Sequence, residues 1–271
     1  MSGKKVKIGL ALGSGGWRGL AHIGVLKSLE KNNIPLDYIT GSSVGALVGG
    51  LYAYYGEVSK IEEIIAGIRY QDLFRFLSDP MADLGLLKGN KFLQFLEFFL
   101  KGVKIEQLKI PFKAATTDIL TGETVYLGKG NLATAIRASI SIPLVLAPVT
   151  IDGKKLVDGG NSTPVPAKMA YQMGADLVIG VNLYGNIFPL TAAIEGKMKL
   201  TTREVFRLSY QMLLNRMAVE NLDDADIALN PKIPEGKFSL FKNFVKEKGI
   251  VSCGEEAMDA KIGLLRQMMG D

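Results

Sequence analysis

The apolar residues of the first third of the chain form runs of two alternating kinds. Residues 5–12 and 36–40 are short apolar runs of the length of a β-strand. Residues 16–32 and 43–56 follow them as longer segments with the spacing and length of helices. This alternation predicts a β-α-β-α start, which is typical of proteins with a largely parallel sheet.

Later segments extend the same pattern. Residues 111–127 predict a strand, a turn and a second strand, residues 151–160 a shorter hairpin, and residues 174–183 a further apolar strand. We therefore expect an α/β fold with a central, mostly parallel or mixed sheet between helix layers. The chain shows no repeat and no linker-like tract, so we expect a single domain over residues 1–271, with a helical insertion at about 57–105 and a helical C-terminal part at about 190–271.

Composition narrows the class of protein. With 271 residues and 48% apolar content the chain is able to bury a full core, which excludes global disorder. The net charge of +5 is spread along the chain; it favours contact with anionic surfaces, including peripheral contact with a membrane, but it does not form the basic stripe of a nucleic-acid-binding protein. The single cysteine excludes an intramolecular disulfide, and the N-terminus has no small-residue cleavage site, so we expect a cytoplasmic protein.

One uncharged stretch raises the possibility of a membrane span. Residues 38–56 contain no charged side chain over 19 positions. The glycine and serines in its first third interrupt a helix, however, and leave only residues 44–55 as a continuous segment, which is too short to cross a bilayer. A buried helix that packs closely on a sheet through its glycines is the favoured interpretation.

The segment Gly41-Ser-Ser43-Val-Gly45 lies between a predicted strand and a predicted helix. In such an arrangement a serine nucleophile occupies a sharp turn, and the flanking glycines remove side chains that would block the turn or the substrate. The N–H groups at the start of the helix point toward any oxyanion formed there. Ser43 is therefore a candidate nucleophile.

A second glycine cluster, residues 13–19, follows the first strand and opens the first helix. A loop of this kind directs backbone N–H groups at an anion, either a phosphate or the oxyanion of acyl transfer. The sequence lacks the Gly-Lys-Ser/Thr ending of a P-loop, and Arg18 stands where a dinucleotide fingerprint has its third glycine. These differences favour the oxyanion.

Two residues are candidates for the base that would activate Ser43. Serine nucleophiles usually act with a histidine, and the chain contains one, His22, which lies among apolar neighbours in the first predicted helix. A packed histidine is the favoured interpretation of that position. Asp158 ends a short strand before Gly159 and Gly160, where a carboxylate is able to project into a cleft. Taken alone, the position is more readily interpreted as a turn aspartate.

Together these motifs resemble the patatin-like phospholipase family. The resemblance rests on Gly15-Gly16-x-Arg18-Gly19, Gly41-x-Ser43-x-Gly45 and Asp158-Gly159-Gly160, in this order, and extends over residues 6 to about 185; residues 137–149 also resemble the segment that precedes the family's aspartate. Ser14 departs from the pattern, since many members have a glycine there.

The resemblance implies a patatin-like three-layer fold and the hydrolysis of acyl esters by a Ser-Asp dyad. Ser43 would be the nucleophile and Asp158 the general base, and His22 would be dispensable. The oxyanion hole would lie at Gly15, Gly16, Trp17 and Arg18, with the N–H groups of Gly15 and Gly16 as donors. No cofactor is implied. One histidine and one cysteine leave no zinc cluster, and the carboxylates lack calcium-loop spacing, so we expect no metal.

The substrate is less certain than the chemistry. Residues 86–102 form an apolar, aromatic-rich helix that either faces lipid or packs on the core, and residues 237–248 predict a second amphipathic segment that suits a membrane surface or plain solvent. A lipid or other acyl ester is the expected substrate. An acyltransferase or thioesterase with the same dyad stays open, as does, less favourably, a catalytically silent scaffold. The sequence does not specify chain length, head group or oligomeric state.

Overall fold

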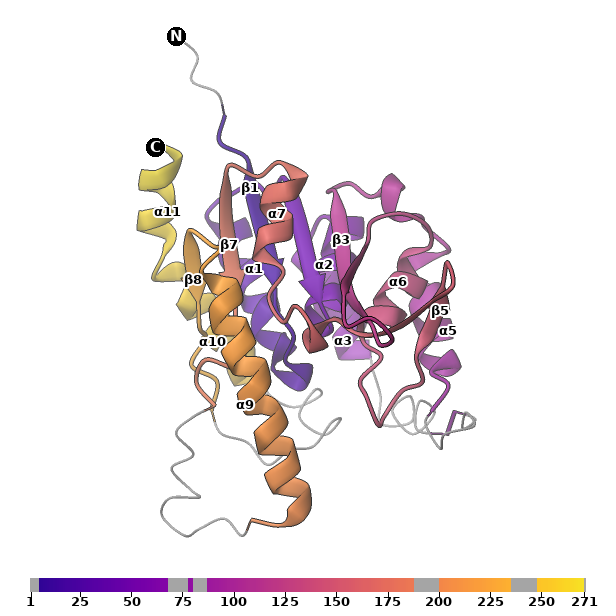
Figure 1. Cartoon of the computed structure of the whole chain (residues 1–271). Helices are drawn as coiled ribbons and strands as arrows, with labels where there is room; N and C mark the ends of the chain where they lie inside the picture. Colours follow the sequence, from indigo (N-terminus) through magenta and orange to yellow (C-terminus); the bar gives the residue numbers. More distant parts are fainter. Residues whose placement is uncertain (1–4, 68–77, 80–86, 188–199, 235–247, 271) are drawn as a thin grey trace.

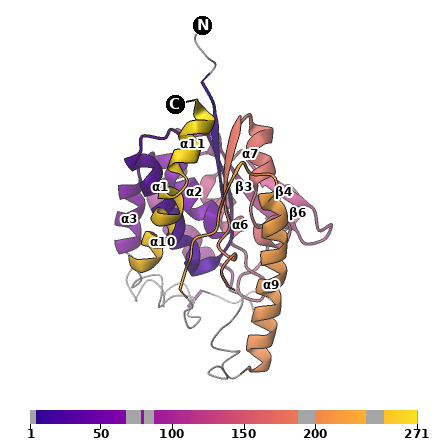
Figure 2. The same cartoon turned by 90° about the vertical axis from the view of Figure 1, so that its left-hand side faces the viewer.

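The computed structural model describes residues 5–67, 78–79, 87–187, 200–234 and 248–270. The described elements form three layers, with one mixed sheet between two layers of helices (Figure 1). Figure 2 shows α1, α3, α10 and α11 on one side of the sheet and α7 and α9 on the other. The predicted α/β fold with a mixed sheet between helix layers is therefore confirmed.

The sheet has eight strands in the order β5-β6-β3-β2-β1-β7-β8, with β4 paired to β3 off this path. Strands β3, β2, β1, β7 and β8 are parallel, whereas β4 and β6 run antiparallel to β3, and β5 runs antiparallel to β6. The bounds are β1 Ile8–Leu12, β2 Tyr38–Ser42, β3 Phe112–Asp118, β4 Thr124–Leu127, β5 Val149–Ile151, β6 Lys154–Asp158, β7 Leu177–Val181 and β8 Ile227–Leu229.

The helices connect these strands and cover both faces of the sheet. The α-helices are α1 Leu20–Lys31, α2 Val44–Tyr55, α3 Val58–Gly67, α5 Asn90–Leu100, α6 Leu132–Ser139, α7 Ala167–Met173, α9 Thr202–Leu222, α10 Lys248–Asp259 and α11 Ile262–Met269. Three short 3-10 helices are η1 Gly16–Gly19, η2 Ile105–Gln107 and η3 Gly159–Asn161.

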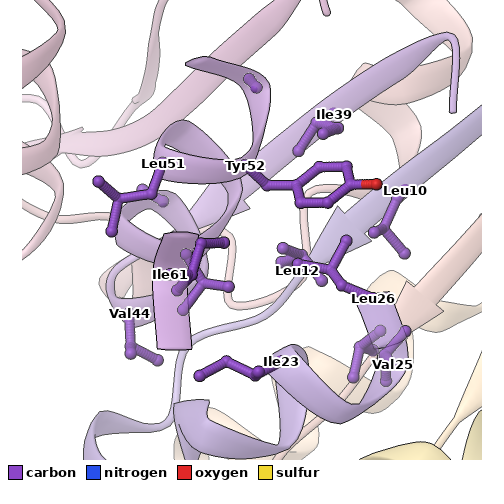
Figure 3. Close-up of a cluster of buried hydrophobic side chains, with 14 of the residues drawn as sticks. Leu10, Leu12, Ile23, Val25, Leu26, Ile39, Val44, Leu51, Tyr52 and Ile61 are labelled. Atoms are coloured by element: carbon purple, nitrogen blue, oxygen red, sulfur yellow. The ribbon is translucent and has the colours of Figure 1, made fainter. Parts of the chain in front are cut away.

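The main core lies between the sheet and the layer of α1, α2 and α3. Figure 3 shows side chains of the two central strands, Leu12 and Ile39 among them, meeting Leu26 of α1, Leu51 of α2 and Ile61 of α3. Strand β1 is buried at all five positions because helices cover both of its faces, which explains its continuous apolar run. A second cluster packs α7 and α9 against the opposite face.

The elements predicted for the first part of the chain are present, with shifted boundaries. Strand β1 begins at Ile8 rather than at residue 5, and α1 begins at Leu20, after the 3-10 turn of η1, rather than at residue 16. The second strand covers 38–42 rather than 36–40, because Gly41 and Ser42 continue the strand instead of beginning the turn. Within 57–105 the described residues form α3 and α5 and the start of η2. In the described part of the chain no helix is long and apolar enough to cross a membrane.

The C-terminal part is not purely helical. Strand β8 adds a parallel edge strand beside β7, and the long helix α9 precedes it, extending beyond the lower end of the sheet in Figure 1. A strand of three residues carries too little periodicity to be recognised in the sequence. The amphipathic segment predicted at 237–248 lies almost entirely outside the described residues.

Strand β3 has three partner strands on its two edges, and this brings the carboxyl ends of β2 and β6 together. Ala115 pairs with Ser42 of β2 and also with β4, so β2 and β4 lie on opposite edges. Thr116 pairs with Asp158 of β6 and also with β4, so β6 shares the edge of β2. Because β2 is parallel and β6 antiparallel to β3, the two strands end head to head at the Ala115–Thr116 step.

Candidate active site

Ser43 occupies the sharp turn between β2 and α2. Its backbone has φ +55° and ψ −123°, a combination that a residue with a side chain rarely adopts. A Cβ at Gly45 would lie 2.0 Å from the carbonyl oxygen of Leu12, and one at Gly41 would lie 2.4 Å from that of Gly45. Both positions flanking Ser43 therefore need glycine, because the turn is packed tightly against β1 and the first turn of α2.

The carboxylate of Asp158 lies directly against the Ser43 hydroxyl. Ser43 Oγ donates to Asp158 Oδ2 at 2.6 Å, and both residues are 5% exposed. The other carboxylate oxygen, Oδ1, accepts the N–H of Gly160 at 2.8 Å. This second bond fixes the carboxylate so that Oδ2 faces the serine. A Cβ at Gly159 would lie 2.2 Å from the Ala115 carbonyl oxygen, so the turn after Asp158 also depends on glycine.

Burial makes Asp158 more basic than an ordinary aspartate. Its desolvation raises the pKa to about 6, although the hydrogen bonds from Ser43 and the Gly160 N–H oppose the rise by stabilising the charged form. The carboxylate is therefore ionised at neutral pH. It also holds a proton far better than a carboxylate in water does.

The glycine-rich loop before α1 lines the same cavity as Ser43 and Asp158. Gly13 and Ser14 donate their N–H groups to the carbonyls of Val181 and Pro164, at 3.0 and 2.8 Å, which anchors the loop to β7 and to the segment after η3. Gly15 and Gly16 then line the same cavity as Ser43, and the structure records no acceptor for their N–H groups among the described residues.

The next two residues of the loop contribute side chains to the cavity wall. The Arg18 N–H donates to the Gly15 carbonyl at 3.3 Å, so it is engaged within the loop. The Arg18 guanidinium lies over the Trp17 ring, 5.0 Å from its centre, and both side chains line the cavity. Burial lowers the pKa of Arg18.

A cavity of about 360 Å³ opens beside the dyad. Its wall is predominantly apolar and comes from α2, α3, α5 and the segment 140–146, whereas α9 and the glycine-rich loop add polar groups. An apolar cavity with a few polar groups gathered around a reactive pair is the usual form of a site for a small organic molecule. Here the wall suits a hydrocarbon chain.

His22 contacts neither member of the dyad. It is fully buried in α1, and its Nε2 lies 2.7 Å from the Gly13 carbonyl oxygen, to which it donates. Burial lowers the pKa of His22 to about 4, so the ring is neutral at physiological pH. The histidine thus supports the glycine-rich loop.

Two residues of α6, to which sequence reasoning gave no role, support the site. Ser139 accepts the N–H of Ser43 at 2.9 Å and donates to the Ala115 carbonyl at 2.6 Å, so it links the nucleophile turn to β3. Arg137 is buried and donates to the carbonyls of Lys88 and Ala147, at 2.7 and 3.1 Å, which fastens two segments next to the cavity wall. The signal that the sequence offered for Arg137 was a single arginine within an otherwise apolar helical segment.

The helix predicted within 86–102 is present as α5 and contributes to both the core and the cavity wall. In α5, Leu96 and Leu100 are buried in the core, whereas Phe92 and Phe95 line the cavity. Phe98 is 75% exposed. The helix is therefore part of the core and part of the cavity wall at once.

Among the described residues, no three His, Cys, Asp or Glu side chains gather closely enough to hold an ion. The chemistry available in the cavity is that of a buried serine hydroxyl, a carboxylate and two backbone N–H groups, which together suit acyl transfer.

Residues 10–171 match the family model described as patatin-like phospholipase. The match covers more than half of the chain and includes the end of β1, the turn at Ser43 and Asp158. The chain therefore belongs to the patatin-like phospholipase family.

Curated relatives show the same membership. An uncharacterised NTE family protein of Mycobacterium tuberculosis is 41% identical over 180 residues, which are 66% of this chain and 50% of that protein. The lysophospholipase NTE1 of Mycosarcoma maydis is 35% identical over 182 residues, 66% of this chain and 10% of that protein. The human patatin-like phospholipase domain-containing protein 6 is 33% identical over 183 residues, 65% of this chain and 13% of that protein. The aligned region thus spans half or less of each relative.

A solved structure supports the fold independently of sequence. The human group IVD cytosolic phospholipase A2, determined with a fluorophosphonate inhibitor, aligns with 98% of this chain and 59% of its own, with a TM-score of 0.51 and 12% sequence identity. At that identity the likeness concerns the fold alone.

Proposed function

We propose that this protein is a serine lipid acyl hydrolase that cleaves acyl esters by means of Ser43 and Asp158. The observation that carries the proposal is the 2.6 Å hydrogen bond from Ser43 Oγ to a buried carboxylate at the mouth of an apolar cavity. Membership of the patatin-like phospholipase family, and a relative named as a lysophospholipase, support a lipid substrate.

In the first half-reaction Ser43 Oγ attacks the carbonyl carbon of the ester, and its proton passes to Asp158 Oδ2. The carbonyl oxygen becomes an oxyanion, which the N–H groups of Gly15 and Gly16 stabilise. The tetrahedral intermediate then collapses. The bond to the alcohol breaks, the alcohol oxygen takes the proton from Asp158, and the acyl group remains esterified to Ser43.

In the second half-reaction water attacks the acyl-serine carbon and gives one proton to Asp158. Collapse of the second tetrahedral intermediate breaks the Ser43 Oγ–acyl bond and returns that proton to Ser43, so the free fatty acid leaves and the dyad is restored. The elevated pKa of Asp158, about 6, suits this exchange, because a base acts best when its pKa lies near the working pH.

The test is turnover of a long-chain acyl ester together with labelling by a fluorophosphonate probe. We expect the wild-type protein to hydrolyse the ester and to be labelled at Ser43, and Ser43→Ala to lose both. Ser42→Ala is the matched control, because Ser42 is a buried neighbour that does not line the cavity. Labelling that persists in Ser43→Ala, or loss of turnover in Ser42→Ala alone, would overturn the assignment.

A further inference from the structure

Helix α9 gives the catalytic cavity a polar wall that lies outside the matched family segment. Arg207, Tyr210 and Gln211 face the cavity at helical spacing, one turn apart. Arg207 Nη1 donates to Gln211 Oε1 at 3.0 Å, and Gln211 is 7% exposed, so the guanidinium is held by a buried partner on its own helix. The position of the Arg207 side chain in this wall is therefore fixed by a hydrogen bond.

The same wall is tied to the catalytic loop. The Tyr210 hydroxyl donates to Asn161 Oδ1, and Asn161 ends η3, three residues after Asp158. Tyr210 lies three residues after Arg207 on the same face of α9. Arg207 therefore lies within one helical turn of Tyr210, which contacts the loop that follows Asp158.

A second guanidinium lines the same cavity. Arg18 lines it from the glycine-rich loop, and the positive charge of Arg207 is near enough to lower the Arg18 pKa, in addition to the larger effect of burial. Two cations that repel each other across a partly desolvated cavity become favourable neighbours when an anion lies between them.

We propose that Arg207, held by Gln211 and acting together with Arg18, forms an anion subsite that selects acyl esters with a net negative phosphate head group over zwitterionic and neutral ones. The inference rests on the proposed hydrolase function. It assigns the apolar wall to the acyl chain and the α9 wall to the phosphate. A zwitterionic head group also brings a cation, which the two guanidinium groups repel.

The experiment compares three lipids with one oleoyl chain: lysophosphatidate, lysophosphatidylcholine and monooleoylglycerol, each presented in the same neutral detergent micelles. We expect kcat/KM to be about tenfold or more higher for lysophosphatidate than for the other two in the wild-type protein. In Arg207→Gln this preference should fall to near unity, and Arg207→Lys should recover part of it because the charge is kept.

Arg216→Gln is the matched control. Arg216 lies on the outer face of the same helix, where its side chain is 84% exposed and pairs with Glu220. We expect it to keep the wild-type preference. Equal kcat/KM for the three lipids in the wild-type protein, or a proportional loss on all three in Arg207→Gln, would overturn the subsite while leaving the hydrolase function intact.

A binding measurement separates the subsite from catalysis. Glycerol 3-phosphate and inorganic phosphate would be titrated calorimetrically into Ser43→Ala, with and without Arg207→Gln. Binding that Arg207→Gln weakens by about tenfold supports the subsite even if none of the three lipids is hydrolysed, a result that would count against the hydrolase function alone. Absence of binding by both phosphates, or binding unchanged by Arg207→Gln, would contradict the subsite.

Discussion

Replacing Asp158 with asparagine should abolish turnover and, above about pH 6, stabilise the folded protein. The amide keeps the size of the side chain and is able to accept the Gly160 N–H, but it cannot take the serine proton. Burial raises the pKa of Asp158 from 3.8 to about 6. At about 1.4 kcal/mol per pH unit, keeping this carboxylate charged in the folded state costs about 3 kcal/mol, which the neutral amide does not incur.

The sign of the effect follows from proton binding. Between about pH 4 and pH 6 the folded protein holds a proton on Asp158 that the unfolded chain has released, so the wild-type protein loses stability as the pH rises through this window. Below about pH 4 both states are protonated and the penalty vanishes. The stability gained by Asp158→Asn should therefore be smallest near pH 4, grow up to about pH 6 and stay constant above it.

Urea denaturation of both proteins between pH 4 and pH 8 measures this difference. Other titrating groups, such as His22, are present in both proteins, so their contributions cancel in the difference between the two free energies of unfolding. Hydrogen bonds altered by the substitution would change the stability difference by the same amount at every pH, so they would not affect how that difference varies with pH. A stability difference that does not vary with pH, or one that falls as the pH rises, would refute the argument that Asp158 is a buried carboxylate with an elevated pKa.

Three further predictions concern the turn, the histidine and the cavity wall. Ser43→Gly should be more stable than Ser43→Ala by about 1 kcal/mol in urea denaturation, because glycine relieves the φ of +55°; an equally stable alanine variant would contradict the strained turn. His22→Gln should keep most of its kcat, because an amide is also able to donate to the Gly13 carbonyl, and a folded variant that had lost several powers of ten would contradict a supporting role. Phe95→Ser should lower kcat/KM for long-chain esters more than for short-chain esters; equal loss on both, with a lower melting temperature, would make Phe95 a core residue only.

The nucleophile turn could be predicted from the sequence because all of its determinants are local. A strand, a Gly-x-Ser-x-Gly segment and a helix follow one another directly, and the close contacts of Gly41 and Gly45 explain why both are glycine. The boundary at the end of β2 was missed because glycine and serine favour turns on their own, whereas here pairing with β1 and β3 keeps them extended.

The meeting of Ser43 and Asp158 could not be derived from local patterns. The two residues are 115 positions apart, and they meet because β2 and β6 share one edge of β3, which depends on the register of three strands. Only the resemblance to a family paired them in advance. The polar wall of α9 gave no signal either, because residues 207, 210, 211 and 214 have the spacing of any helix face that packs on a core.

The proposed mechanism also explains how a serine hydrolase works with a histidine that does not reach its nucleophile. An exposed aspartate, with a pKa near 3.8, is too weak a base to take a serine proton readily at neutral pH. The head-to-head ending of β2 and β6 buries Asp158 against the sheet, and the pKa of about 6 that results approaches the 6.5 of an ordinary imidazole. In the proposed mechanism, burial thus gives a carboxylate the basicity that serine hydrolases usually obtain from histidine. His22, with its pKa near 4, is then free to act as a neutral hydrogen-bond donor to the glycine-rich loop.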